Sequence, residues 1–134
     1  MKQYFFKYVL TASALLVLAN AASSQVVIMN PNAAPLTKDQ VANIYLGRSF
    51  DFKPVDLPEG AALREQFYKK ATDRDQSQIK AVWSRILFTG KGQAPLILPD
   101  AAAVKKAVAT DPKAIGYVDK GALDSTVKVV LSLD

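Results

Sequence analysis

The feature that most constrains the fold is an alternation of short apolar runs with longer segments of helical periodicity. Runs of strand length stand at residues 25–29 (QVVIM), 54–57 (PVDL), 115–118 (IGYV) and 127–131 (VKVVL). Most of these runs are rich in β-branched residues, which favour strands. Because helical segments separate most of them, the sequence predicts an α/β domain in which helices pack on a central sheet.

Four helices are predicted from N-cap residues, apolar spacing and glycines. Thr37 begins the first helix with Gln40 at the capping-box position, and Gly47 ends it in a left-handed cap. The other three are expected over residues 61–71, 76–87 and 101–109, the last of them capped by Asp100.

The third of these helices has the clearest pattern. Asp75 is its N-cap, because a short acidic side chain can accept the free N–H groups of the first turn. The helix then carries one apolar stripe at the spacing i, i+3, i+4, i+7, i+8. The stripe consists of Ile79, Val82, Trp83, Ile86 and Leu87.

Residues 1–21 have the pattern of a secretory signal peptide, with two lysines and then an apolar run at residues 9–19. This run is shorter than the ~20 residues that span a membrane, and residues 19–21 (ANA) form a small-x-small cleavage site. We therefore expect cleavage before Ala22, which would release a single domain of residues 22–134 into the periplasm, without membrane attachment. An uncleaved anchor is the alternative, but it needs a longer apolar stretch.

The composition argues against several classes of function. The chain has no cysteine and no histidine, which removes disulfides, cysteine chemistry, the usual metal ligand and the usual general base. No pairing of acidic residues with a nucleophile stands out, so we predict no enzymatic activity, no cofactor and no metal. The net charge of +5 is spread over scattered lysines, which favours attraction of anions but not nucleic-acid binding.

Two phrases, residues 36–47 (LTKDQVANIYLG) and 114–118 (AIGYV), resemble one lobe of the phosphate-binding subunit of ABC-type phosphate transporters. Residues 64–68 (REQFY) are similar to the helix that follows the anion-binding turn in that family. The resemblance covers nearly all of the chain after the leader. It implies one lobe of a type 2 periplasmic-binding-protein-like fold, with a central mixed sheet flanked by about four helices. It also implies an oxyanion ligand, such as phosphate, and a link to ABC-type uptake.

The sequence departs from that family at the turn that holds phosphate. Family members are longer, bind their ligand between two lobes and carry a Ser-Gly-Thr turn, where this chain has Ala61-Ala62-Leu63. The hydroxyl donors are therefore absent, although backbone N–H groups at a helix start can still hold an anion. The resemblance makes Gly60, Ala61, Ala62 and Arg64 the candidate ligand-binding residues.

Arg64 has two interpretations. Its guanidinium fork fits the geometry of an oxyanion and could bind one in bidentate fashion. Alternatively, it is a surface arginine paired with Glu59 or Asp56. Tyr45, Trp83 and Tyr117 are candidate pocket residues for which core packing is favoured, and we expect Leu63 to point into the core.

A second candidate site is the segment RSFDFK, in which Arg48 and Lys53 flank Phe50 and Phe52. Two phenylalanines in a polar loop indicate either a folded-back corner or an exposed contact patch. The sequence thus supports two hypotheses of function. The first is an exported oxyanion binder, and the second is a non-catalytic interaction or accessory module of the same fold. Such a module would contact a partner protein or a second copy of itself.

Overall fold

The structure, a computed structural model, describes residues 24–133. The predicted signal peptide at residues 1–21 lies outside these residues. The elements follow in the order β1 (Gln25–Met29), α1 (Lys38–Tyr45), β2 (Lys53–Asp56), α2 (Ala62–Thr72), α3 (Gln76–Thr89), β3 (Leu96–Ile97), α4 (Ala101–Thr110), β4 (Ala114–Asp119), the short 3-10 helix η3 (Lys120–Ala122) and β5 (Lys128–Leu133).

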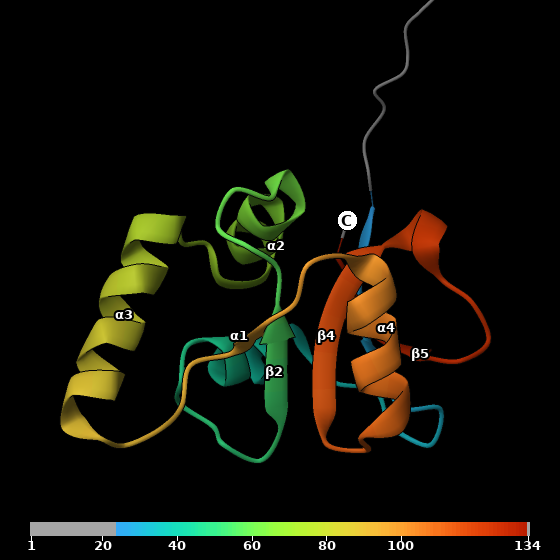
Figure 1. Cartoon of the computed structure of the whole chain (residues 1–134), viewed down its shortest axis with the longest axis horizontal. Coiled ribbons are helices and arrows are strands. Elements are labelled where there is room, and N and C mark those ends of the chain that lie inside the picture. Colours follow the sequence, from blue (N-terminus) through green and yellow to red (C-terminus); the bar gives the residue numbers. More distant parts are fainter. Residues whose placement is uncertain (1–23, 134) are drawn as a thin grey trace, which may run out of the picture.

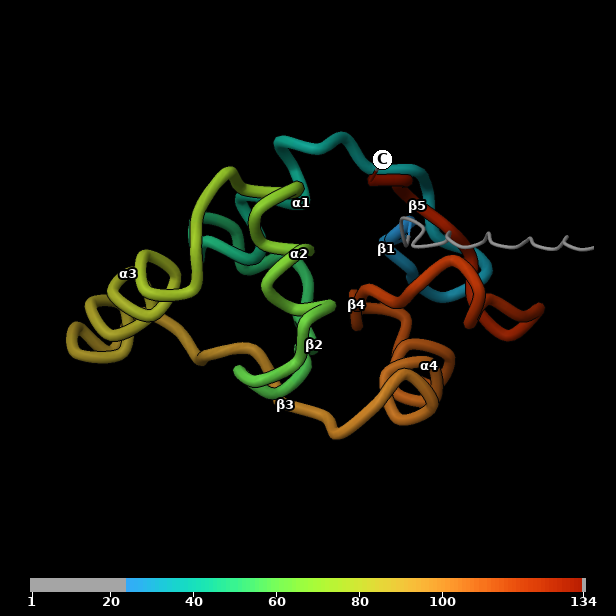
Figure 2. The backbone as a smooth tube through the Cα atoms, turned by 90° about the horizontal axis from the view of Figure 1, so that it is seen from above, coloured from blue at the N-terminus to red at the C-terminus, as the bar shows by residue number. Residues whose placement is uncertain are grey.

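In this part of the chain five strands form one mixed sheet in the order β3-β2-β4-β1-β5. β1 runs antiparallel to its neighbours β4 and β5, whereas β2 runs parallel to β4 and β3. Figures 1 and 2 place α1 and α4 on opposite faces of the sheet and α3 beyond its β2 side, far from β5. The predicted fold class, a mixed sheet flanked by four helices, is confirmed.

β1 shows why the run QVVIM is apolar at its last four positions. The strand lies between β4 and β5, and all of its residues are buried. A strand covered on both faces needs apolar residues at successive positions, because neither face meets water. The predicted strands at residues 54–57, 115–118 and 127–131 are also present, with ends shifted by one or two residues.

An aromatic cluster fills the space between α1, α2 and β4. The ring of Phe67 stacks on that of Tyr117, with centroids 3.9 Å apart and planes 3° from parallel. The Tyr45 ring meets Phe67 edge-on at 4.7 Å. All three side chains are buried, and such pairs add about 0.5–1.5 kcal/mol beyond the burial of their area. This cluster holds α2 in place above the end of β2.

The predicted helix caps are confirmed. Thr37 and Gln40 form a capping box, in which Thr37 Oγ1 accepts the Gln40 N–H at 3.1 Å and Gln40 Oε1 accepts the Thr37 N–H at 2.8 Å. Gly47 follows α1 with a φ of +73°. A Cβ there would lie 2.1 Å from Ile86 Cδ1, so α1 and α3 approach each other over a glycine.

The apolar stripe of α3 is covered at only part of its length. Ile79 and Trp83 are buried, but Leu87 is 50% exposed and the adjacent Phe88 is 92% exposed. The reason is the position of α3 beyond the β2 side of the sheet (Figure 1), where the corner after α1 meets the helix at Trp83 and Ile86. None of the helices in residues 24–133 has the length and apolar character needed to cross a bilayer.

Candidate functional site

The β2–α2 turn contains the candidate residues Gly60, Ala61 and Ala62. Ala61 is the N-cap of α2, and no side chain caps the free N–H groups of its first turn. The Ala61 N–H itself donates to the carbonyl oxygen of Pro58 at 2.9 Å and is therefore used. Gly60 and Ala62 are exposed. The N–H groups that remain open to an anion are thus those at the start of the helix.

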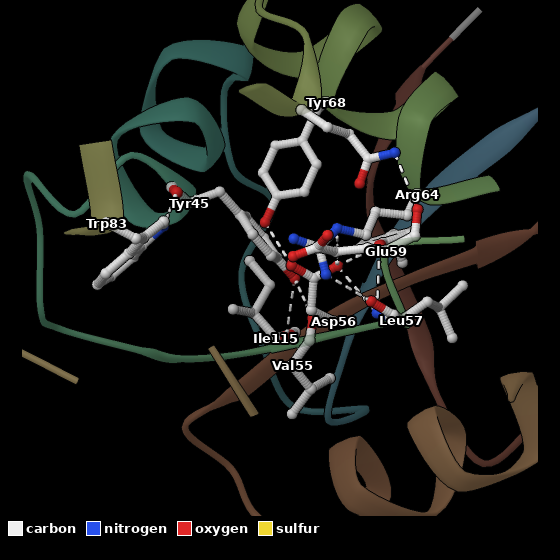
Figure 3. A network of polar contacts seen from close by, with 11 residues as sticks. Tyr45, Val55, Asp56, Leu57, Glu59, Arg64, Tyr68, Trp83 and Ile115 are labelled. Carbon is white, nitrogen blue, oxygen red and sulfur yellow. Dashed lines mark hydrogen bonds and ion pairs between the residues drawn. The ribbon is translucent and has the colours of Figure 1, made fainter. Parts of the chain in front are cut away.

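Arg64 lies in the first turn of α2 and is only 9% exposed, which corrects the prediction of a surface arginine. Its Nη1 donates to the carbonyl oxygen of Leu57 at 2.8 Å, and its guanidinium carbon lies 5.5 Å from the centre of the Tyr68 ring. Its Nε is buried without a hydrogen-bond acceptor, 3.9 Å from Oδ1 of Asp56 (Figure 3). Of the two acidic partners considered for Arg64, Asp56 is the one observed in an ion pair.

Asp56, at the end of β2, is the centre of the polar network and is 1% exposed. Its Oδ2 accepts the hydroxyl proton of Tyr68, and its Oδ1 accepts that of Tyr117 and the N–H of Leu57. A buried carboxylate requires such partners, because an unpaired one would cost several kcal/mol. Sequence reasoning considered Asp56 only as a partner of Arg64. An acidic residue inside a predicted strand was the signal for its larger role.

The three buried tyrosines keep their hydroxyl protons. Burial, and next the charge of Asp56, raises the pKa of Tyr45, Tyr68 and Tyr117 above the ordinary value of 10.0. Tyr68 and Tyr117 therefore act as hydrogen-bond donors to Asp56. The Tyr45 hydroxyl donates to the carbonyl oxygens of Val55 at 2.8 Å and Ile115 at 3.1 Å, which joins β2 to β4.

Trp83 ties α3 to this network, because its Nε1 donates to the carbonyl oxygen of Tyr45 at 2.9 Å. The predicted core role of Trp83, Tyr45 and Tyr117 is confirmed by their burial. Trp83 also lines two cavities, and both of them are lined as well by Ala94 of the segment before β3. Leu63 is half-buried and packs against the core.

The first cavity, here called the Arg64 pocket, lies between α2, α3 and β3 and has a volume of about 460 Å³. Its deepest members are Asp56, Arg64 and Tyr68, which are nearly or fully buried. Leu87 and Ile97 stand at its mouth, each 50% exposed. The other residues that line it are Pro58, Glu59, Ile79, Lys80, Trp83, Ser84, Ala94 and Pro95.

The structure divides the segment RSFDFK between two surfaces. Phe50 is 55% exposed, whereas Phe52 is half-buried and packs against the core, so each of the two interpretations holds for one phenylalanine. Both line a second cavity of about 740 Å³ together with Lys53, whose Nζ forms an ion pair with Asp111 at 3.2 Å. Arg48 instead lines separate cavities beside α1 and α3. Three of the four predicted contact residues therefore line one cavity, and Arg48 lines others.

Within residues 24–133, no group of three or more His, Cys, Asp or Glu side chains is placed to hold a metal ion. The polar side chains of the Arg64 pocket are two carboxylates, a guanidinium, an ammonium group and two hydroxyls, which belong to Asp56, Glu59, Arg64, Lys80, Tyr68 and Ser84. The Tyr68 hydroxyl already donates to Asp56, so the buried donor group left to a ligand is the Arg64 guanidinium.

The fold of residues 24–133 resembles one lobe of a periplasmic-binding-protein-like domain. No protein-family model matches the sequence, and no curated protein matches it either. Several solved structures, however, match the fold of this chain. An ABC-type phosphate transport receptor from Vibrio cholerae superposes with a TM-score of 0.64 at 17% identity, over 81% of this chain and 47% of the receptor.

Two further solved proteins give the same result. A phosphate ABC transporter substrate-binding protein from Clostridium perfringens, solved with bound phosphate, has a TM-score of 0.64 at 18% identity, covering 81% of this chain and 45% of its own. PstS from Borrelia burgdorferi has a TM-score of 0.56 at 11% identity, covering 74% and 42%. The chain thus spans about half the length of the proteins it matches. At these identities the likeness shows the fold.

Proposed function

We propose that residues 22–134 form an exported, non-catalytic binding domain for a small oxyanion, with Arg64 as its anchor. The observation that carries this proposal is the guanidinium of Arg64. Of its five N–H donors, one donates to Leu57, and no other acceptor lies within hydrogen-bonding distance in the described part of the chain. A buried guanidinium with unused donors at the base of a cavity is suited to an anion.

Two further observations support an oxyanion. The first turn of α2 has no side-chain cap, so N–H groups remain open beside Arg64. Two of the matching solved proteins are a phosphate transport receptor and a substrate-binding protein with bound phosphate. Phosphate is therefore the first ligand to test, and a role in ABC-type uptake after removal of residues 1–21 is part of the same proposal.

Asp56 limits the affinity. Its carboxylate lies 3.9 Å from the Arg64 Nε and repels an incoming anion. The Ala61-Ala62-Leu63 turn has no hydroxyl donor to offset this repulsion. We expect a dissociation constant of about 1 mM, which corresponds to about −4 kcal/mol.

Thermal unfolding tests the proposal. At a dissociation constant of about 1 mM, about 10 mM phosphate should stabilise the domain by about 1.4 kcal/mol through mass action. Sulfate should be compared at the same ionic strength, with chloride as the baseline. If neither anion raises the melting temperature above chloride, the oxyanion proposal is wrong.

Two variants test whether the anion that raises the melting temperature binds at Arg64. Arg64→Lys keeps the positive charge beside Asp56 but loses the planar fork, so it should remove most of the shift measured against its own baseline. Lys53→Ala removes an exposed cation outside the Arg64 pocket and should leave the shift unchanged. Equal shifts of the melting temperature in wild type and Arg64→Lys would show that Arg64 does not bind the anion.

A second candidate function is a contact module of the same fold. The observation that favours it is a set of large apolar side chains that stand exposed around β3, the end of α3 and the loop before β2. They are Phe50, Leu87, Phe88, Leu96 and Ile97, each at least 50% exposed. Large exposed apolar side chains can mark protein contacts, and a second copy of the chain is the simplest partner.

Light scattering over a range of protein concentrations tests this candidate. Self-association that Leu96→Asp abolishes would support the contact module, because the substitution puts a charge on the exposed edge strand β3. A strict monomer at every concentration would rule out self-association through this surface.

A further inference from the structure

We propose that the anion of the Arg64 pocket is the carboxylate of a small organic acid with an apolar body. This inference rests on the proposed function and names the ligand class of the same site. Three properties of the pocket carry it: the position of the unused donors, the character of the walls and the balance of charges.

The unused donors lie deep in the pocket. Arg64 is only 9% exposed and lines the pocket. Its Nη1 is held by the Leu57 carbonyl and its ring contact is with Tyr68, so the fork cannot turn away to solvent without losing both. A ligand that reaches this fork must therefore enter the pocket, and the part behind its anionic group must lie against the walls.

The walls between the fork and the mouth are mostly apolar. Trp83 and Ile79 come from one face of α3, Leu87 follows one turn later, and Pro95 and Ile97 face them from the β3 segment. A volume of about 460 Å³ is within the range of small-molecule sites. Inorganic phosphate would leave this apolar surface in contact with water, whereas an aromatic or branched body would cover it.

The charged side chains of the pocket favour a ligand with one negative charge over a ligand with two. Asp56 and Glu59 line the pocket together with Arg64 and Lys80, so the formal charges cancel. A dianion would meet the repulsion of Asp56 twice while it gains the same fork of donors. A carboxylate carries one charge, and its two oxygens match the planar guanidinium.

Fluorescence offers a direct assay, because Trp83 is the single tryptophan in the chain and lines the pocket. Phenylacetate, 2-phenylethanol and inorganic phosphate would each be titrated into the full chain at one ionic strength. We expect phenylacetate to bind at least about tenfold more tightly than either of the others. The alcohol has the same apolar body without the charge, and phosphate has charge without the body.

Two substitutions at adjacent positions distinguish binding in the pocket from binding elsewhere on the surface. Leu87→Asp places a negative charge at the mouth of the pocket and should weaken phenylacetate binding at least about tenfold. Phe88→Asp makes the same change one residue later, at a side chain that is 92% exposed and does not line the pocket, and should leave binding within about twofold. Both positions are exposed, so both variants should fold.

The outcomes distinguish this inference from the proposal on which it rests. Binding of phosphate without binding of phenylacetate would overturn the organic acid and leave the oxyanion proposal standing. Binding of neither would overturn both. Equal binding of phenylacetate and 2-phenylethanol, or equal weakening by Leu87→Asp and Phe88→Asp, would also overturn the inference.

Discussion

Alkaline unfolding tests the buried tyrosines most directly. Tyr45, Tyr68 and Tyr117 are at most 1% exposed, and burial together with the charge of Asp56 raises the pKa of each above 10.0. In the unfolded chain they titrate near that ordinary value. Above about pH 10 the folded state therefore holds more protons than the unfolded state, and stability must fall as pH rises.

The magnitude follows from proton linkage. Each tyrosine that stays protonated in the folded state lowers the free energy of unfolding by about 1.4 kcal/mol per pH unit above pH 10. The three together give a slope of about 4 kcal/mol per pH unit, and a loss of about 4 kcal/mol by pH 11. Since small domains have a total stability of about 5–15 kcal/mol, the protein should unfold above about pH 11.

Circular dichroism and the absorbance of tyrosinate should be followed together in a Tyr4→Phe/Tyr8→Phe background, in which the three buried tyrosines are the only tyrosines left. Both signals should change in one transition. Tyr45→Phe is the matched variant, because its hydroxyl contacts backbone carbonyls and not Asp56. It should reduce the slope by about one third, to about 2.7 kcal/mol per pH unit.

Two results would refute this reasoning. One is tyrosinate absorbance that develops fully while the circular dichroism remains that of the folded protein, since buried tyrosines would then ionise without unfolding. The other is an alkaline slope that is the same for wild type and Tyr45→Phe.

The remaining predictions concern stability near neutral pH, measured by urea unfolding. Asp56→Asn should cost about 3 kcal/mol, because it removes a buried charge that is bonded to several donors; a loss below about 1 kcal/mol would contradict the central role of Asp56. Gly47→Ala should cost about 2–4 kcal/mol, because it adds a clash with Ile86 to the strain of a positive φ. Gly90→Ala is its control, with a φ of +72° and open space around it, and should cost only about 1 kcal/mol; equal losses would show that the clash is relieved. Asp75→Ala should lower the unfolding midpoint by removing an N-cap, and an unchanged midpoint would mean that the α3 cap contributes nothing.

Local features of the chain could be predicted because their causes are local. Thr37, Asp75 and Asp100 each accept an N–H three residues later, and that spacing is visible in the sequence. Gly47 adopts the left-handed conformation because it follows a helix end and has no Cβ, which is also a local cause. The buried runs could be assigned to strands because their apolar side chains need a covered position.

The candidate site was predicted only in part. The sequence and the family resemblance pointed to Arg64 and the β2–α2 turn, but not to the role of Asp56 or to the apolar pocket. The partners of Asp56 are 12 and 61 residues away in the chain, on α2 and β4. No periodicity or motif connects positions at such separations.

The sequence by itself determined the identity of four of the five strands in residues 24–133, the starts of three capped helices and the absence of cysteine and histidine chemistry. These properties depend on backbone preferences over a few residues and on composition. The tertiary structure decided that Arg64 is buried, that Asp56 collects two tyrosine hydroxyls and that Leu87 stays exposed. The physical reason is that burial and charge pairing depend on which elements pack together. Here the sheet order and the place of α3 beyond the sheet set that packing.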